Sequence, residues 1–386
     1  MKIVIAPDSF KESLSALQVA AAIEAGMREV WPDAEYLKVP VADGGEGTVQ
    51  ALIDATGGRR AAVRVTGPLG EPVDAFYGLV DDRDGGEGLL AVIEMAAASG
   101  LESVPPARRD PLVTTTRGTG ELILHALDAG ARRFVLGVGG SATNDGGAGM
   151  LQALGVRLLD GGGGEIGAGG GALAQLARID ASALDARVRD SDFQVASDVA
   201  NPLVGPNGAS AIFGPQKGAT PEVVAQLDAN LRRYAAIVER DLGQDVAEVP
   251  GAGAGGGIAA AMMVFLNGRM RPGVEIVTEA VGLAGALAGA DLVVTGEGRI
   301  DGQTVNGKTP MGVARVAARH GVPVIGIAGS LAADAGAVHA HGIEAVSAAV
   351  TRPCSVAEAL AAGEENLRHA ARNVAALLRL GGRLGR

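Results

Sequence analysis

The sequence predicts an α/β protein whose parallel sheet is built from both ends of the chain. Short runs of β-branched and aliphatic residues alternate with longer segments of helical periodicity, which is typical of strands joined by crossover helices. The alternation stops near residue 60 and returns near residue 285, and the strands expected in between look antiparallel. We therefore expect one α/β domain over 1–60 and 285–386, a mixed α/β domain inserted over 61–284, and a cleft between them, where small-molecule sites tend to lie.

The apolar pattern of the N-terminal part predicts strands and helices in alternation. Residues 3–6 form an apolar run expected to be a buried strand, and residues 13–30 carry a wide apolar stripe expected to be a helix. Ser9 and Glu12 fit a capping box before that helix. A second strand is expected over 37–41 and a second helix over 48–55.

The rest of the chain continues this alternation, except that antiparallel strands are expected after residue 60. Gly, Pro and Asp turns separate the antiparallel strands expected over 63–65, 73–80 and 89–94. Residues 161–171 hold eight glycines in eleven positions, which predicts a flexible surface loop without a function. Ser355 and Glu358 predict a capping box for the last long helix. Further strands are expected over 134–138, 193–197, 291–295, 324–328 and 345–350, and helices over 120–129, 148–154, 311–319 and from Pro221.

Composition and charge exclude several classes of partner and site. The 386 residues carry 33 Lys and Arg against 44 Asp and Glu, a net charge of −11, which argues against nucleic acid and anionic membranes as partners. Cys354 is the one cysteine, so an internal disulfide and a thiolate zinc cluster are excluded. The N-terminal apolar run is too short for a signal peptide, and Pro250 with a glycine cluster interrupts the uncharged stretch 249–268. We therefore expect a cytoplasmic protein without a membrane span.

The strongest functional signal is the segment 137–147, GVGGSATNDGG, between an expected strand and helix. Glycines let backbone N–H groups approach an anion, and a helix N-terminus adds a positive partial charge. Ser141 and Thr143 add hydroxyl donors, and Asp145 is a candidate metal ligand. The alternative is a tight turn that binds nothing.

Two further clusters follow expected strands. Asp198 directly follows an expected strand, and a carboxylate at the C-terminal end of a strand can bind Mg²⁺ or take a hydroxyl proton. The alternative is that Asp198 forms an Asx turn before Pro202. Arg299 and Lys308 offer cations for a carboxylate or phosphate; the alternative is a solvated surface loop. Residues 302–309 match the Walker A pattern, but they stand too far from their strand, and Pro310 removes a backbone donor, so we do not predict a P-loop.

Other residues extend the candidate site. Asp8 and Lys11 follow the first strand, where an open α/β sheet binds ligands, and Lys217 is a cation beside a turn. The pentapeptide DGGEG occurs at 43–47 and again at 84–88, and we assign function to the first copy because the second falls in an expected hairpin. The five histidines are scattered and do not support a histidine base. Amide nests, carboxylates and a few cations suit phosphoryl transfer, so the residues alone indicate a phosphotransferase or a nucleotide-binding protein.

The chain resembles the bacterial glycerate kinase family from end to end. The matching motifs are APDSFK (6–11), VADGGEGT (41–48), GGSATNDGG (139–147), Asp198 with NPL (201–203), GPNG (205–208), GPQK (214–217), and GEGR (296–299) through Asp301, Gln303 and Lys308. The resemblance implies ATP-dependent phosphorylation of D-glycerate by a Rossmann-like domain with an inserted second domain. Ser197 and Gly302 depart from the Cys and Ser that are common in the family, and neither departure removes a catalytic group.

The resemblance also implies a division of roles. Asp198 would hold Mg²⁺ and orient or deprotonate the attacking hydroxyl, Lys11 and Arg299 would hold the glycerate carboxylate or the transferred phosphoryl group, and Lys308 would neutralise developing charge. Asp145 would be a second Mg²⁺ ligand. ATP would contact Gly139, Gly140, Ser141, Thr143 and Asn144, and the glycerate side of the site would include Asp8, Ser9, Asp43, Asn201, Lys217, Asp301 and Gln303.

Several alternatives stay open at this point. The bacterial resemblance favours the 2-hydroxyl of glycerate over the 3-hydroxyl as the acceptor. A nucleotide-binding regulator without turnover, a module that only binds a sugar acid, and a kinase for another small hydroxy acid are rival functions. We expect a monomer or a homodimer.

Overall fold

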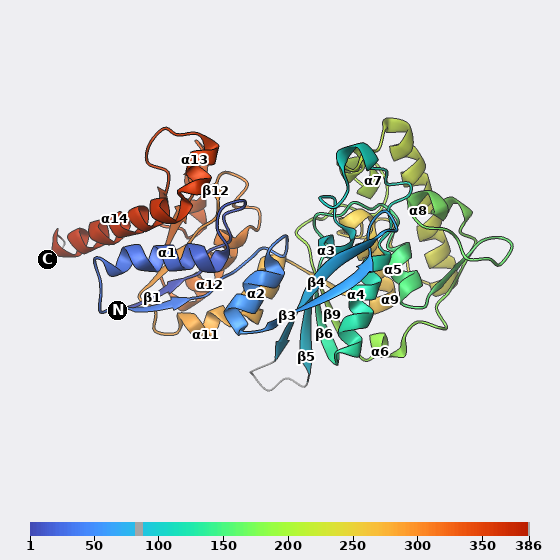
Figure 1. The fold of residues 1–386 in the computed structure, drawn as a ribbon, viewed down its shortest axis with the longest axis horizontal. Coiled ribbons are helices and arrows are strands. Elements are labelled where there is room, and N and C mark those ends of the chain that lie inside the picture. Colours follow the sequence, from blue (N-terminus) through green and yellow to red (C-terminus); the bar gives the residue numbers. More distant parts are fainter. Residues whose placement is uncertain (82–87, 385–386) are drawn as a thin grey trace. The chain divides into compact units, whose positions relative to one another are not determined.

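The computed structural model describes residues 1–81 and 88–384. The chain divides into two compact units, and each holds a sheet of its own (Figure 1). Unit 1 comprises residues 1–43, 50–57 and 274–386, and unit 2 comprises residues 44–49 and 58–273. The predicted α/β class is confirmed, with one parallel sheet and a second, mixed sheet. Within the described ranges, no helix is long and apolar enough to cross a membrane.

The sheet of unit 1 has five parallel strands in the order β15-β13-β11-β1-β2. Its strands are β1 (Lys2–Ile5), β2 (Glu35–Lys38), β11 (Leu292–Thr295), β13 (Val324–Ala328) and β15 (Ala345–Ala348). From β1 the chain moves to one side, to β2, whereas β11, β13 and β15 follow one another to the other side. The direction therefore reverses between the adjacent strands β1 and β11.

The helices of unit 1 come from both ends of the chain. They are α1 (Ala16–Arg28), α10 (Gly273–Ala280), α11 (Leu283–Leu287), α12 (Thr309–His320), α13 (Val356–Ala361) and α14 (Gly363–Leu384), and α2 (Thr48–Thr56) begins in unit 2 and continues into unit 1. A two-stranded pair, β12 (Arg299–Ile300) with β14 (Ser330–Leu331), lies beyond the main sheet. Ile3, Ile5 and Ile23 are completely buried in a core that α1 and α14 share with the strands. The apolar stripe of α1 therefore faces the sheet, as its sequence predicts.

Two capping predictions need correction. The first helix begins at Ala16 with a capping box of Ser15 and Gln18, not with Ser9 and Glu12. The reason is that Glu12 has a left-handed backbone with φ of 61°, which a helix cannot contain, and Ser9 binds Asp8 instead. The capping box of Ser355 and Glu358 exists, but it starts the short helix α13, and the long helix α14 begins only at Gly363.

Unit 2 has a six-stranded mixed sheet in the order β10-β9-β6-β5-β4-β3. The strands β3, β4 and β5 are antiparallel and β5, β6, β9 and β10 are parallel. The strands are β3 (Arg59–Thr66), β4 (Pro72–Asp81), β5 (Leu89–Glu94), β6 (Ala131–Gly137), β9 (Asp192–Ala196) and β10 (Arg269–Arg271), with a separate hairpin of β7 (Arg157–Leu159) and β8 (Arg178–Asp180). Residues 84–87 of the second DGGEG copy lie outside the described residues.

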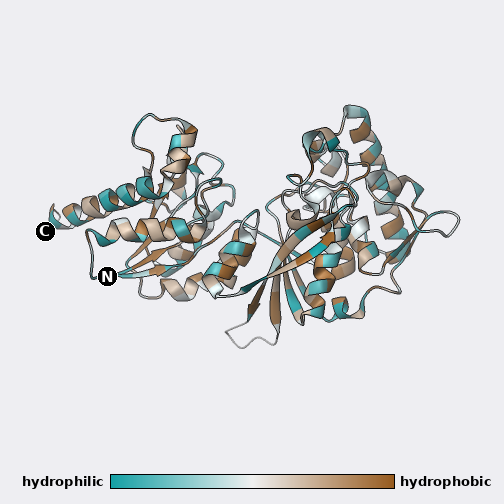
Figure 2. Cartoon of the chain, viewed as in Figure 1, coloured by the Kyte–Doolittle hydropathy of each residue, from teal (hydrophilic) through white to brown (hydrophobic). Residues whose placement is uncertain are grey.

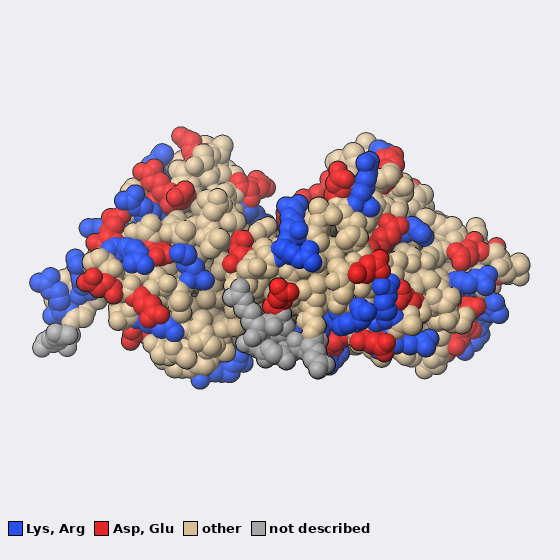
Figure 3. All heavy atoms as spheres, turned by 60° about the horizontal axis from the view of Figure 1, so that its bottom comes forward, with Lys and Arg blue, Asp and Glu red and all other residues tan. Residues whose placement is uncertain are grey.

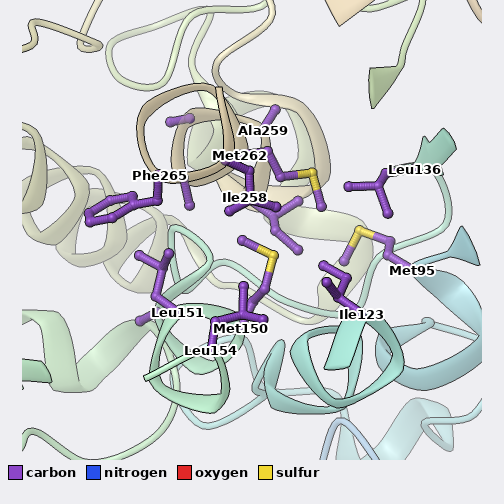
Figure 4. Packing of buried hydrophobic residues seen from close by; sticks show 14 of the residues in the cluster. Met95, Ile123, Leu136, Met150, Leu151, Leu154, Ile258, Ala259, Met262 and Phe265 are labelled. Carbon is purple, nitrogen blue, oxygen red and sulfur yellow. The ribbon is translucent and has the colours of Figure 1, made fainter. Parts of the chain in front are cut away.

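The core of unit 2 forms where its helices meet the sheet. Figure 4 shows Ile123, Leu136, Met150 and Met262 pointing toward one another from different elements. Figure 2 shows strands that are mostly hydrophobic and helices that carry both polar and apolar residues. The helices are α3 (Ala96–Ser99), α4 (Arg117–Asp128), α5 (Ala148–Ala153), α6 (Ala186–Arg189), α7 (Ala209–Phe213), α8 (Pro221–Leu242) and α9 (Ile258–Leu266).

The prediction for the glycine-rich segment 161–171 is wrong at its C-terminal end. Residues 161–165 are exposed, but Gly169 and Gly170 are buried, and Gly170 begins a 3-10 helix over Gly170–Gln175. A Cβ on Gly170 would lie 2.4 Å from the carbonyl oxygen of Asn144. This glycine is therefore required for close packing against the segment 137–147.

The contact between α1 and α14 yields a stability prediction. A Cβ at Gly26 would lie 2.1 Å from the carbonyl oxygen of Arg368, so Gly26→Ala is expected to lower the free energy of unfolding by about 1–3 kcal/mol. Gly381→Ala on α14 is the matched control, because no atom lies within 4 Å of its added Cβ, and it should raise stability by up to about 1 kcal/mol through helix propensity. Urea denaturation of both variants measures the difference. Equal stability of the two variants would contradict the close packing.

Candidate functional site

The glycine-rich loop 138–147 connects β6 to α5 in unit 2. Gly139 and Gly140 are exposed, whereas residues 141–147 are buried. Gly140 and the pair Gly146 and Gly147 have φ values of 69°, 62° and 79°, a region that favours glycine. The loop thus exposes the backbone of its first two glycines and anchors its second half inside the unit.

Lys217 supports this loop from inside unit 2. Its ammonium group, Nζ, donates hydrogen bonds to Ser141 Oγ at 2.7 Å and to the carbonyl oxygen of Thr143 at 2.6 Å. The residue is 2 % exposed, and burial lowers the pKa of its amine to about 7, against a smaller opposing effect of Asp145. This environment favours a supporting role for Lys217 over the predicted contact with substrate.

Asp145 is a buried anchor of the same loop. Its Oδ2 accepts hydrogen bonds from Thr116 N, Thr116 Oγ1 and Gly149 N at 2.9, 2.8 and 3.2 Å, and its Oδ1 accepts one from Gly147 N at 3.1 Å. The carboxylate is completely buried, and burial raises its pKa. Because donors from the protein occupy both oxygens, this geometry does not favour the predicted role of Asp145 as a metal ligand.

Three buried polar atoms at the loop have no hydrogen-bond partner among the described residues. They are Thr143 Oγ1, Asn144 Nδ2 and the hydroxyl of Tyr234, a side chain that lies next to Gly146. The other amide atom of Asn144, Oδ1, accepts from Ser210 Oγ at 3.1 Å. Unpaired buried groups cost about 1–3 kcal/mol each, so these atoms mark positions that a water or a ligand atom would complete.

Asp198 and Glu94 end strands that neighbour β6. Asp198 follows β9 and is exposed, and its Oδ1 accepts from Gly273 N at 3.3 Å. Glu94 ends β5 opposite Gly137 of β6, and it accepts a hydrogen bond from Val49 N at 2.8 Å and further ones from the amides of Gly47 and Thr48. The parallel strands β5, β6 and β9 thus bring Glu94, the loop 138–147 and Asp198 to one sheet edge.

Glu94 was not a predicted site residue. Its carboxylate holds the N-terminus of α2, and burial raises its pKa. The one signal in the sequence is a glutamate that closes an apolar strand. Asn201, which was predicted, binds its own loop through a hydrogen bond from its Nδ2 to the carbonyl oxygen of Asn207 at 2.8 Å.

The predicted residues of unit 1 gather at the carboxyl edge of its parallel sheet. Asp8 and Ser9 follow β1, Asp43 follows β2, and the segment 297–301 follows β11. Asp8 Oδ2 accepts from Thr309 Oγ1 at 2.5 Å, and its Oδ1 accepts from Ser9 N at 2.7 Å. Burial first, and then the charge of Asp43, raises the pKa of Asp8 to about 7.

Cations in unit 1 form a network with acidic side chains. Lys308 Nζ lies 3.4 Å from Glu297 Oε2 and 3.6 Å from Asp301 Oδ1, and Arg299 Nε lies 3.8 Å from Asp301 Oδ2. Gln303 is exposed, and its backbone N–H donates to Asp301 Oδ1 at 2.9 Å. Glu297 of this network and Thr309, which binds Asp8, were not predicted. Lys11 is exposed on the loop after β1.

The match to the Walker A pattern has no P-loop geometry. The strand β12 and a turn separate residues 302–309 from β11, and Lys308 is the N-cap of α12 with its ammonium group beside Glu297 and Asp301. A phosphate-cradling loop follows its strand directly. The rejection of a P-loop at this segment is therefore confirmed by the structure.

Lys217 leads to a prediction about pH and stability. Because burial lowers the pKa of its amine in the folded protein to about 7 from an ordinary value of 10.5, the unfolded state holds more protons between these two pH values. The free energy of unfolding should therefore rise as the pH rises above about 7, by up to about 1.4 kcal/mol per pH unit from this group. Denaturation of the wild type and of Lys217→Met at pH 7 and pH 9 tests this. Identical pH dependence in both proteins would contradict it.

Comparison with known proteins places the chain in a family. The model of the glycerate kinase family matches residues 3–379. The chain is 58% identical over 381 residues to glycerate 2-kinase of Escherichia coli K12, with 99% of each chain covered, and 57% identical over 380 residues to glycerate kinase of Bacillus subtilis 168, with 98% of each covered. A crystal structure from Salmonella typhimurium LT2 superposes with a TM-score of 0.90 at 58% identity and 99% coverage of both chains. The chain therefore belongs to the glycerate kinase family.

Proposed function

We propose that this protein is a glycerate kinase that transfers the γ-phosphoryl group of ATP to the 2-hydroxyl of D-glycerate in the presence of Mg²⁺. The full-length match to named glycerate kinases supports the reaction, and the name of the Escherichia coli relative supports the 2-hydroxyl. The structural observation that carries the proposal is the loop 138–147, whose exposed glycines stand at the carboxyl edge of parallel strands.

We assign the nucleotide to unit 2. The backbone amides of Gly139 and Gly140 are the exposed donors for phosphate oxygens, and Ser141, Thr143 and Asn144 shape the loop behind them. On the face shown in Figure 3, Lys and Arg side chains are interspersed with Asp and Glu side chains. In such a surface, phosphate binding depends on local amides and a bound cation rather than on a broad positive field.

The Mg²⁺ assignment rests on Asp198. Within the described ranges, no three His, Cys, Asp or Glu side chains are grouped to hold a metal ion, and Mg²⁺ in phosphoryl-transfer enzymes is commonly held by one or two carboxylates together with the substrate phosphates. The exposed carboxylate of Asp198 fits this mode, and the buried Asp145 does not. When bound, Mg²⁺ would neutralise charge on the transferred group.

We assign glycerate to unit 1. Lys11 and Arg299 are exposed cations for its carboxylate, and Lys308 neutralises charge on the transferred group. Asp301 pairs with Arg299 and Lys308, and we assign Asp43 and Gln303 supporting roles at the same site. Units 1 and 2 would then be the Rossmann-like domain and the inserted domain that the sequence predicts.

A coupled assay tests the proposed reaction. With ATP, Mg²⁺ and D-glycerate we expect ADP formation, and phosphorus–proton correlation by NMR should place the new phosphate on C2, which carries one proton, and not on C3, which carries two. ATP binding without turnover would instead support a nucleotide-binding regulator. Turnover only with another hydroxy acid would replace the substrate.

Asp198→Asn tests the residue that we assign to Mg²⁺. The substitution keeps the size of the side chain and removes its charge, so kcat should fall at least about 100-fold, the usual scale for a positioned catalytic group. Asp190→Asn, an exposed aspartate at the end of α6, is the matched control and should retain activity. Near-normal turnover of Asp198→Asn would remove Asp198 from the mechanism.

A further inference from the structure

Asp8 lies at the point where the strand order of unit 1 reverses. Its backbone N–H donates to the carbonyl oxygen of Gly296 at 2.8 Å, so the segments that follow β1 and β11 are joined directly beyond the sheet. In open α/β sheets, ligands bind outside the carboxyl ends of the strands at such a reversal. The backbone therefore places Asp8 at the carboxyl end of β1 beside the reversal of strand order, where open α/β sheets bind their ligands.

Hydrogen bonds fix the Asp8 carboxyl group from two sides. Thr309 Oγ1 donates to Oδ2, and both the N–H and the hydroxyl of Ser9 donate to Oδ1, the hydroxyl at 3.3 Å. Thr309 is completely buried at the first turn of α12. The orientation of Asp8 is thus set by an element distant in the sequence and not by its own loop alone.

The charged groups that act most strongly on Asp8 are acidic. Asp43, after β2, and Glu297, after β11, both raise the pKa of Asp8 through their charge. Two nearby cations form ion pairs with acidic side chains other than Asp8. Lys308 pairs with Glu297 and Asp301, and Arg299 pairs with Asp301. Lys11 lies on the loop of Asp8 itself. Burial and like charge together favour the protonated carboxyl group.

We propose that Asp8 is the group that takes the proton of the attacking hydroxyl. The inference rests on the proposed function and assigns to Asp8 the deprotonation that the sequence analysis gave to Asp198. In the step, the hydroxyl oxygen of glycerate forms a bond to the γ-phosphorus of ATP. The bond from that phosphorus to the bridging oxygen breaks, ADP leaves, and the hydroxyl proton passes to the carboxylate of Asp8.

A half-buried carboxylate is better suited to this task than an exposed one. A general base is most effective when its pKa lies near the working pH, and burial raises the pKa of Asp8 to about 7. Asp198, in contrast, is exposed. Asp198 keeps its role toward Mg²⁺ in this account.

The pH dependence of kcat tests the inference. In the wild type, kcat should fall about tenfold per pH unit below about pH 7, because the protonated Asp8 cannot accept a proton. Asp8→Asn should lower kcat at least about 100-fold, leave KM for D-glycerate within about threefold, and abolish this acidic limb. Asp198→Asn should also lower kcat but keep the limb, so the two carboxyl groups are distinguished within one experiment.

Thr309→Val provides a second, independent variant. The hydrogen bond from Thr309 lowers the pKa of Asp8, so its removal should shift the acidic limb to higher pH while kcat on the alkaline plateau stays close to that of the wild type. This shift tests whether Asp8 accepts the proton even if Asp8→Asn fails to fold.

Four outcomes would overturn parts of this account. A limb that survives in Asp8→Asn, or near-normal turnover of that variant, would remove Asp8 as the proton acceptor and leave the proposed function intact. A limb that does not move in Thr309→Val would do the same. A wild-type protein that forms no ADP with D-glycerate would remove the proposed function and this role with it.

Discussion

The pairing of β1 with β11 joins the two ends of the chain into one sheet. Ile3 lies opposite Leu292 and Ile5 opposite Val294, and the hydroxyl of Thr295 donates to the carbonyl oxygen of Ala6 at 2.8 Å across 289 residues of sequence. Burial of these strands on both faces favours the pairing. Because β1 and β11 are adjacent, Asp8 and Glu297 become neighbours at their carboxyl ends. The candidate chemistry of unit 1 depends on that adjacency.

In unit 2, buried polar side chains fix the loop of the candidate site. Lys217 and Asp145 hold the loop 138–147 from inside with short hydrogen bonds, and Gly170 lets the chain pack closely beneath it. A loop fixed in this way presents the amides of its first glycines without reorganisation. Preorganised donors are the largest single contribution to many transfer reactions, so the cost of burying Lys217 is consistent with a functional role for the loop.

Local pattern was sufficient to predict much of this arrangement. The strand, glycine loop and helix around residues 134–154 follow from apolar periodicity and from glycines that only special backbone conformations require. Asp8 was predicted as a ligand-edge residue from its place after an apolar strand. Lys217, in contrast, was predicted to be a substrate-binding cation beside a turn, because nothing near it in sequence shows that its ammonium group would bind Ser141 and Thr143.

The residues that sequence reasoning missed depend on contacts between distant segments. Glu94 receives the N-terminus of α2, which lies 45 residues earlier, and Thr309 reaches Asp8 across 301 residues. Glu12 and Ser9 show the opposite error: they match a capping box, but the chain adopts a left-handed backbone at Glu12. A motif of four residues describes what a helix start requires and not whether a helix starts there.

A crystal structure with Mg²⁺, a non-hydrolysable ATP analogue and D-glycerate tests the central claim most directly. The account predicts phosphate oxygens on the backbone amides of Gly139 and Gly140, and the glycerate 2-hydroxyl within hydrogen-bonding distance of the Asp8 carboxylate. Phosphates bound instead along residues 302–309, or glycerate held away from Asp8, would contradict it.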